Sequence, residues 1–152
     1  EKKILDTGGG VLNSLNHFKN KNLLIINSDI FWRDNNLEDV NLLIDKYNKI
    51  LLPSLLLVKK NNAYGLIKNK GDFYLKNNKV LRYKEEEENF FYSGLQILNL
   101  DVFKNFNKKK FSFNEIWDYL IFKERLHGHV MHSNWYHVGD IQGLAIAKEL
   151  EA

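Results

Sequence analysis

Asp29 stands in the clearest chemical setting of the sequence. It follows the apolar run at residues 22–26 and the polar pair Asn27 and Ser28, in the stretch INSDIFW. Open α/β sheets bind ligands outside the carboxyl ends of their strands, which is where Asp29 is expected to lie. A carboxylate there can hold Mg²⁺, which takes oxygen ligands and usually shares them with substrate phosphates. An acidic turn residue or a helix cap is the alternative for a single aspartate.

A second candidate is the run of three glycines, Gly8 to Gly10, which stands directly before a helical pattern at residues 11–18. Glycines before a helix let the backbone pass close to a ligand, and the helix start offers free N–H groups and the positive end of its dipole. The run is therefore compatible with nucleotide contact, although it matches neither the P-loop nor the G-x-G-x-x-G fingerprint. A tight turn capped by Asp6 or Thr7 explains the same residues equally well.

Asp72 and His137 carry weaker signals. Asp72 follows Gly71 in KGDFYL, which by itself predicts an ordinary turn. His137, in NWYHVGD, could be a metal ligand, an acid or base, or a half-buried structural histidine, which is the usual case. Four histidines lie near this end of the chain, and their spacing matches no recurring zinc pattern: His127, His129, His132 and His137.

Alternating strands and helices are expected to position these groups. The short apolar run at residues 22–26 predicts a buried strand of a parallel sheet. Apolar residues at helical spacing predict a helix over 35–50, and residues 54–60 read as the next strand. Strand, helix and strand in this order predict a right-handed βαβ crossover.

The rest of the chain continues the mixed α/β pattern. The expected elements are, in order, a hairpin at 71–83 with Asn77 and Asn78 in its turn, a strand at 89–99 interrupted by Gly94, a helix at 111–126, and a helix at 141–152 capped by Asp140. A glycine in the middle of a strand often marks the close approach of a backbone or a ligand.

Composition narrows the class of protein. The chain has 152 residues, of which 44% are hydrophobic, so a disordered chain is excluded. A net charge of +3 is too small to indicate nucleic-acid binding. The absence of cysteine removes disulfides and thiolate chemistry, and no apolar stretch approaches the roughly 20 residues that span a bilayer. We expect a cytoplasmic protein that neither binds nucleic acid nor inserts into a membrane.

Five stretches, taken together and in order, resemble the sugar-1-phosphate nucleotidyltransferase family. The closest resemblance is to the N-acetylmuramate-1-phosphate uridylyltransferase branch and its mannose-1-phosphate guanylyltransferase-like relatives. The resemblance covers nearly the whole chain, and the stretches that carry it are LDTGGGVLNSL, LLIINSDIF, GDFYL, FFYSGLQILN and WYHVGD.

The resemblance implies a Rossmann-like α/β fold, with a mixed, mostly parallel sheet flanked by helices. It also implies a reaction in which a sugar 1-phosphate attacks the α-phosphorus of a nucleoside triphosphate, UTP or GTP, with Mg²⁺ as cofactor and pyrophosphate as leaving group. The implied residues are Thr7, Gly8, Gly9 and Asn27 at the nucleotide, Asp29 as the catalytic Mg²⁺ ligand, and Asp72 and Gly94 at the sugar.

The sequence departs from the family in two places. Family members open with a glycine-rich loop carrying an arginine, followed by a proline-lysine pair, and no such loop stands before LDTGGG here. The resemblance therefore implies that residues 1–152 form a single nucleotidyltransferase domain without its N-terminal strands and loop, and that this piece alone is inactive. Second, many members read W-x-D-V-G-T where this chain has His137, and that acid is the second Mg²⁺ ligand. Either His137 contacts a phosphate or a metal-bound water, or Asp29 holds the metal alone.

Two functions follow as hypotheses. The first is an enzyme that transfers a nucleoside monophosphate, with UMP as the expected group, to a sugar 1-phosphate for sugar-nucleotide and cell-wall synthesis. The second is a non-catalytic module of the same fold that binds a nucleotide or sugar phosphate and regulates a partner. The missing loop and His137 favour the second; the ordered motifs favour the first.

Overall fold

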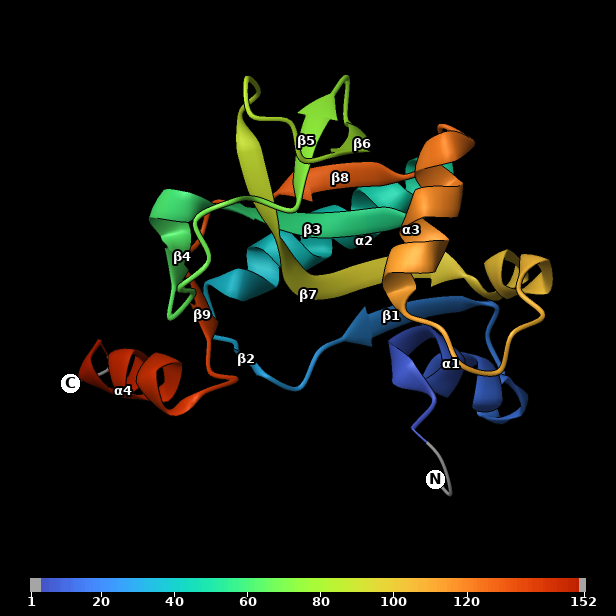
Figure 1. Cartoon of the computed structure of the whole chain (residues 1–152), viewed down its shortest axis with the longest axis horizontal. Coiled ribbons are helices and arrows are strands. Elements are labelled where there is room, and N and C mark those ends of the chain that lie inside the picture. The colour runs from blue at the N-terminus through green and yellow to red at the C-terminus, as the bar shows by residue number, and fades with distance from the viewer. Residues whose placement is uncertain (1–3, 151–152) are drawn as a thin grey trace.

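A six-stranded sheet forms the centre of the computed structural model, which describes residues 4–150 (Figure 1). Its strands are β1 (Asn22–Ile26), β3 (Ser54–Lys59), β5 (Phe73–Lys76), β6 (Lys79–Arg82), β7 (Asn89–Asn99) and β8 (His127–Val130). They are ordered β1-β7-β3-β8-β6-β5, and β5 also pairs with β7. This last pairing closes five of the strands into a small barrel, from which β1 extends beside β7.

The mixed α/β class is confirmed, but the expectation of a mostly parallel sheet is wrong. Only the pairing of β3 with β8 is parallel among the described strands of this sheet; the other pairings are antiparallel. The long strand β7 runs antiparallel between β1 and β3, so it separates the two strands of the expected βαβ unit. The β5–β6 hairpin is antiparallel by construction, because a two-residue turn reverses the chain.

A second, three-stranded sheet carries part of the site. Its strands are β2 (Ile30–Phe31), β4 (Ala63–Tyr64) and β9 (Trp135–His137), in the order β2-β9-β4. Helix α4 (Ile141–Glu149) follows directly and lies beside β9 (Figure 1). The expected cap of α4 is confirmed, because the Asp140 side chain accepts a hydrogen bond from Gly143 N at 2.7 Å.

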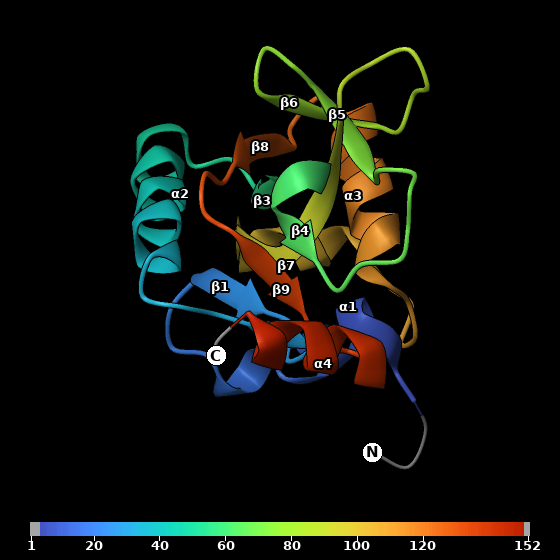
Figure 2. The same cartoon turned by 90° about the vertical axis from the view of Figure 1, so that its left-hand side faces the viewer.

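Helices cover both sides of the large sheet. Figure 2 shows α2 (Asn36–Ile50) on one side and α3 (Phe113–Phe122) on the other. The remaining helical segments are α1 (Asp6–Asn13) and three 3₁₀ turns, η1 (Leu15–His17), η2 (Lys60–Asn62) and η3 (Leu100–Asn105). No helix among residues 4–150 is long and apolar enough to cross a membrane.

The continuous apolar run of β3 is explained by burial on both faces. Leu55 and Leu57 belong to the apolar core under α3, whereas Leu56 and Val58 belong to the core under α2. All four side chains are at most 1% exposed. Burying a side chain of this size contributes about 1.5–3 kcal/mol, so β3 holds the two layers together.

Two expectations about local structure need correction. The strand at residues 22–26 is present as β1, but it is not buried: Leu24 is 40% exposed and Ile26 is 51% exposed. The helix expected after the glycine run begins earlier, at Asp6, so the glycines lie inside α1. The hairpin turn is as expected, since Asn77 and Asn78 both have positive φ, 53° and 62°.

Candidate functional site

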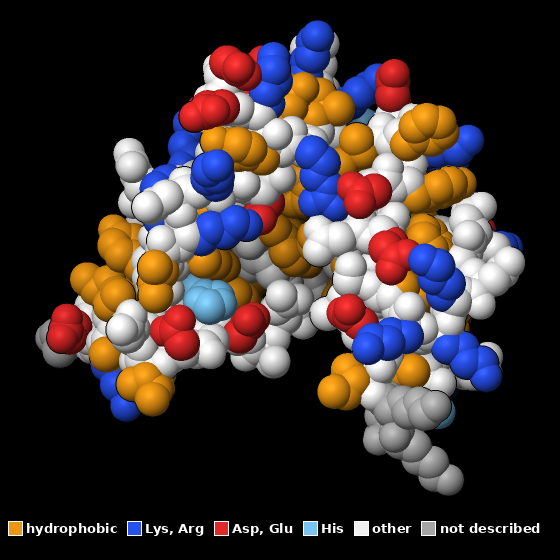
Figure 3. Space-filling view, in the orientation of Figure 1, with side chains coloured by type: hydrophobic (Ala, Val, Ile, Leu, Met, Phe, Trp, Pro, Cys, Tyr) orange, Lys and Arg blue, Asp and Glu red, His pale blue; other side chains and the backbone are white. Residues whose placement is uncertain are grey.

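A cleft formed by two adjoining cavities lies where the two sheets approach α1 and α3. The cavities measure about 160 and 340 Å³ and share Asn27, Asp72 and Tyr92 in their walls. Figure 3 shows the hollow on this face, between the part that contains β9 and α4 and the part that contains α1 and α3. The smaller cavity is also lined by Asp29, Lys68, Gly94 and His137, and the larger one by Thr7, Gln96, Asn114 and Trp117.

Asp29 and His137 lie close together at one end of the cleft, and their roles at a metal stay a prediction. The pairing of β2 with β9 places Ile30 opposite His137, and Val138 N donates to the Asp29 carbonyl at 2.9 Å. His137 Nε2 lies 3.5 Å from Asp29 Oδ2. The other oxygen, Asp29 Oδ1, is buried and makes no hydrogen bond within the described part of the chain.

Hydrogen bonds attach the segment before β9 to α2, and they hold the position of His137. The buried Asp39 carboxylate accepts hydrogen bonds from His132 N at 2.9 Å and from Ser133 N at 3.1 Å. Trp135 Nε1 donates to the Ser93 carbonyl at 2.7 Å and so attaches β9 to β7. The Trp135 bond is buried and the Asp39 bonds are partly buried, and breaking a buried hydrogen bond costs more free energy than breaking an exposed one.

Gly94 brings β7 against the segment that carries Asn27 and Asp29. Its φ is +83°, a conformation that favours glycine. A Cβ at this position would lie 2.8 Å from Ile30 Cγ1, and Asn27 N donates to the Gly94 carbonyl at 2.8 Å. In this structure the missing side chain of Gly94 allows Asn27 and Ile30 to approach β7. Gly94 also lines the cleft. Contact of Gly94 with a sugar stays a prediction.

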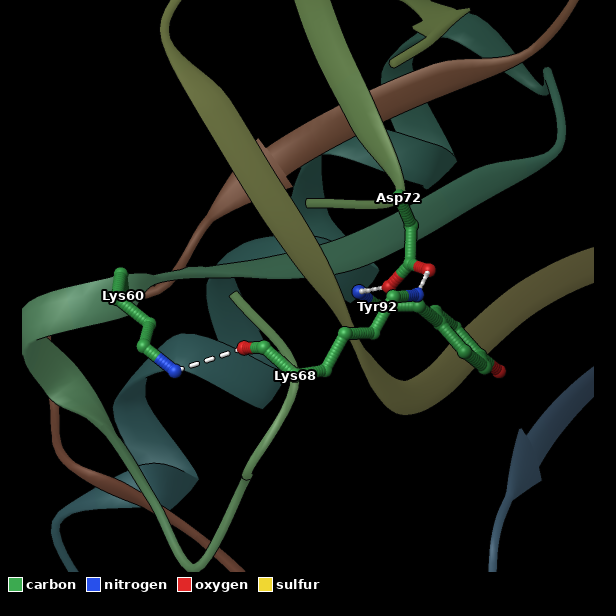
Figure 4. A network of polar contacts seen from close by, with 4 residues as sticks. All are labelled: Lys60, Lys68, Asp72 and Tyr92. Carbon is green, nitrogen blue, oxygen red and sulfur yellow. Dashed lines mark hydrogen bonds and ion pairs between the residues drawn. The ribbon is translucent and has the colours of Figure 1, made fainter. Parts of the chain in front are cut away.

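Asp72 is held by a small polar network, which Figure 4 shows. One of its oxygens accepts from Lys68 Nζ and the other from Tyr92 N at 3.0 Å. Lys60 Nζ in turn donates to the carbonyls of Leu66 and Lys68, at 3.1 and 2.8 Å, and so anchors the loop that presents Lys68. Asp72 thus enters the cleft with its carboxylate already oriented.

Lys68 and Tyr92 were not found by sequence reasoning. Lys68 carries the only lysine or arginine charge in the cavity walls, as far as residues 4–150 are concerned. Its one sequence signal is its place four residues before Asp72. Tyr92 lies in the run NFFYSG, which reads as strand core, so nothing in the sequence marks its hydroxyl. Burial, with the nearby Asp29 carboxylate as a smaller cause, raises the pKa of the Tyr92 hydroxyl far above its usual value of 10.0.

The glycine run has a packing role in this structure. Gly9 N donates to the Phe111 carbonyl at 3.0 Å, and a Cβ at Gly8 would lie 2.6 Å from the Phe111 ring. A Cβ at Gly9 would overlap the Lys109 carbonyl oxygen. Neither Gly8 nor Gly9 lines the two cavities, whereas Thr7 does. Nucleotide contact by these three residues stays a prediction.

The donor set around Asp29 suits Mg²⁺ anchored by one carboxylate. No group of three or more His, Asp or Glu side chains that could hold a metal is found between residues 4 and 150. Magnesium sites commonly use one or two carboxylates and complete their shell with water and substrate phosphates. The unpartnered Asp29 Oδ1 is an oxygen of the required kind, and the imidazole of His137 is a poorer ligand for this cation.

Comparison with known proteins identifies the family of the chain. The family model described as nucleotidyl transferase matches residues 1–151, which is nearly the entire chain. No curated protein matches the chain significantly.

Several solved structures share the fold. HddC from Yersinia pseudotuberculosis, solved with GMP-PN, is 17% identical, with a TM-score of 0.70 over 99% of this chain and 64% of that one. A protein described as a glucose-1-phosphate thymidylyltransferase from Bacillus anthracis, solved with sucrose, is 15% identical, with a TM-score of 0.77 over 99% and 62%. The inositol-1-phosphate CTP transferase of T. maritima is 8% identical, with a TM-score of 0.71 over 94% and 59%. The chain thus spans less than two thirds of each of these proteins.

Proposed function

The chain belongs to the nucleotidyl transferase family, and we propose that its protein transfers a nucleoside monophosphate from a nucleoside triphosphate to a sugar 1-phosphate. An oxygen of the sugar phosphate attacks the α-phosphorus, the bond to the β-phosphate breaks, and pyrophosphate leaves. We propose UTP as the nucleotide and N-acetylmuramate 1-phosphate as the first acceptor to test, on the strength of the motif resemblance.

One observation carries the proposal: the cleft gathers the expected polar residues from distant parts of the chain. Thr7, Asn27 and Asp29 precede α2, whereas Asp72 follows β4 and His137 lies in β9, yet all five line the adjoining cavities. Such convergence is typical of a ligand site. Asp29, Asp72 and Lys68 supply two carboxylates and one ammonium group, which suit a cation and a phosphorylated sugar.

Each of these side chains has a distinct task in the proposed reaction. Asp29 Oδ1 would hold Mg²⁺, which supplies charge neutralisation for the phosphates when it is bound. Asp72, oriented by Tyr92 N, would accept a hydrogen bond from a sugar hydroxyl. Lys68 would attract the phosphate of the sugar into the cleft. Catalysis in this scheme consists of positioning and electrostatic stabilisation.

The test is pyrophosphate release by the complete protein, with UTP, GTP, CTP and dTTP each paired with several sugar 1-phosphates. Asp29→Asn is expected to reduce kcat by roughly 100-fold or more, because it removes a metal ligand and keeps the shape. Asp45→Asn, the same change at an exposed position of α2, is the matched control and should turn over like wild type. Wild-type turnover by Asp29→Asn would show that the metal site is misplaced.

His137 supports a second candidate, the non-catalytic binding module. It lies beside Asp29 where the family usually has an acid, so the chain offers one carboxylate to a metal at this end of the cleft. The two candidates differ in turnover. A module would bind a nucleotide or sugar phosphate and release no pyrophosphate, either as wild type or as His137→Asp.

A further inference from the structure

The hydroxyl of Tyr92 is the buried polar group that the proposed reaction leaves without a role. It has almost no solvent-accessible surface and makes no hydrogen bond of normal geometry among residues 4–150, although the Gln96 side chain is near enough to lower its pKa as a weak hydrogen-bond donor. A buried hydroxyl without a partner costs free energy, and the large majority of such groups in native proteins are paired. The Gln96 oxygen already accepts from Trp117 Nε1, so the proton of the Tyr92 hydroxyl has no acceptor in the described chain and can be donated to a ligand.

The aromatic ring of Tyr92 is held in place, so the direction of its hydroxyl is fixed. The ring packs edge-on against Trp117, with centroids 4.7 Å apart and planes at 64°. Trp117 is itself anchored, since its Nε1 donates to Gln96 Oε1 at 3.0 Å. The backbone of Tyr92 is tied to Asp72 through the 3.0 Å hydrogen bond described above. Such a side chain is preorganised for a ligand.

The surroundings of Tyr92 indicate the kind of ligand. Tyr92 lines both cavities and lies near Asp29, whose Oδ1 is also buried without a partner. The two groups are a donor and an acceptor, yet they do not bond to each other. A phenol is protonated at neutral pH, so it can act as a donor. A ligand oxygen that accepts from Tyr92, close to a cation on Asp29, would satisfy both.

We propose that the Tyr92 hydroxyl donates a hydrogen bond to an oxygen of the bound sugar 1-phosphate. The inference rests on the proposed function and adds a specificity-determining residue to it. The sugar phosphate is favoured over the nucleotide because the backbone N of Tyr92 orients Asp72, which the proposed reaction places at the sugar. Tyr92 thus lies in the same cavity as Asp72, the proposed sugar ligand, and Asp29, the proposed metal ligand.

The experiment replaces Tyr92 with phenylalanine in the complete protein, because Tyr92→Phe keeps the ring on Trp117 and removes only the hydroxyl. KM is measured in pyrophosphate release for N-acetylmuramate 1-phosphate, glucose 1-phosphate and mannose 1-phosphate, and separately for UTP. KM for the sugar phosphate should rise about tenfold, as expected for one lost hydrogen bond, while KM for UTP changes less than about twofold. Tm should stay level or rise, since an unpaired buried hydroxyl disappears.

Tyr119→Phe is the matched control, because Tyr119 lies on α3 and lines a cavity apart from this cleft. It should leave both KM values unchanged. The inference is overturned, and the proposed function stands, if Tyr92→Phe turns over with an unchanged KM for the sugar phosphate. It is also overturned if both KM values rise together with a fall in Tm, since that pattern indicates a purely structural role. Absence of binding and turnover in the wild type would overturn both proposals.

Discussion

At the scale of single residues, the two carboxylates of the cleft differ in how they are satisfied. Both oxygens of Asp72 have protein partners, Lys68 Nζ and Tyr92 N. Asp29 has one oxygen 3.5 Å from His137 Nε2 and one with no partner among residues 4–150. Environments that differ in this way assign different roles to chemically identical groups. Asp72 is suited to orient a ligand, and Asp29 is suited to hold a cation.

His137→Asp tests whether position 137 is part of the metal site. A second carboxylate next to Asp29 repels it without metal and supplies a further hard oxygen with metal. The variant should therefore have a lower Tm than wild type in EDTA, a larger rise in Tm on adding Mg²⁺, and a lower half-saturating Mg²⁺ concentration in any turnover. Thermal unfolding with and without Mg²⁺ measures this directly. An equal response of both proteins to Mg²⁺ would contradict the assignment.

The sequence located most of the cleft because polar residues at strand ends carry a recognisable signal. Asn27, Asp29 and Asp72 all line the cleft, and their roles at the nucleotide, the metal and the sugar stay predictions. Lys68 and Tyr92 were not predicted as site residues, because their place in the cleft depends on contacts in the folded chain. Lys68 forms an ion pair with Asp72, and Tyr92 carries a buried hydroxyl within an apolar strand. The spacing of four residues between Lys68 and Asp72 is the only trace of these contacts in the local sequence.

At the scale of elements, the glycines of α1 lie at a place of close approach, as the sequence indicates, but they approach another segment of the chain. The sequence marks them as a place of close approach, and the structure shows that the approaching group includes the chain itself, at residues 109–111. Their position inside a helix has a cost, because glycine is a weak helix former. Close contact between α1 and the segment before α3 offsets that cost.

Gly9→Ala should destabilise the protein by about 1–3 kcal/mol, because the added methyl group meets the Lys109 backbone, which cannot swing aside. Gly10→Ala, one position along the same helix and only partly buried, should be neutral or stabilising by up to about 1 kcal/mol. Urea unfolding of the three proteins compares them. If Gly9→Ala were as stable as Gly10→Ala, the packing role of the glycine would be refuted.

Strand directions could not be predicted for a related reason. Residues 22–26, 54–60 and 89–99 were all identified as strands, but their partners depend on contacts between distant segments. Insertion of β7 between β1 and β3 turned an expected parallel unit into two antiparallel pairings. The apolar run of β1 suggested burial on both faces, whereas β3 is the strand that both helices cover.

At the scale of the whole molecule, a buried histidine links stability to pH. His129 in β8 is 6% exposed, and its Nε2 has no hydrogen-bond partner in the described structure. Burial, with smaller effects of Lys46 and His127, lowers the pKa of His129 from 6.5 to about 4. The folded protein therefore resists protonation of this side chain, whereas the unfolded chain accepts a proton as the pH falls through 6.5.

The free energy of unfolding should fall between pH 6.5 and pH 4 because of His129, by on the order of 3 kcal/mol. His129→Leu should remove this part of the pH dependence, whereas replacing the exposed His17 by glutamine should leave it in place. Urea unfolding at pH 7.5 and pH 4 measures the difference for each protein. Equal losses of stability in wild type and His129→Leu would show that folding does not lower the pKa of His129.

The closed barrel has a consequence for how the chain is made. Asn22 of β1 pairs with Asn99, 77 positions later, and of the barrel pairings only the β5–β6 hairpin joins neighbouring segments. On a ribosome that adds about 5–20 residues per second, β1 would wait roughly 4–15 s for its partner strand. During that interval its apolar side chains are exposed to other nascent chains and to chaperones. The emergence of β7, which pairs with β1, β3 and β5, is therefore the event that gives the backbone of β1 its hydrogen-bond partners, whereas Leu24 and Ile26 stay partly exposed in the folded chain.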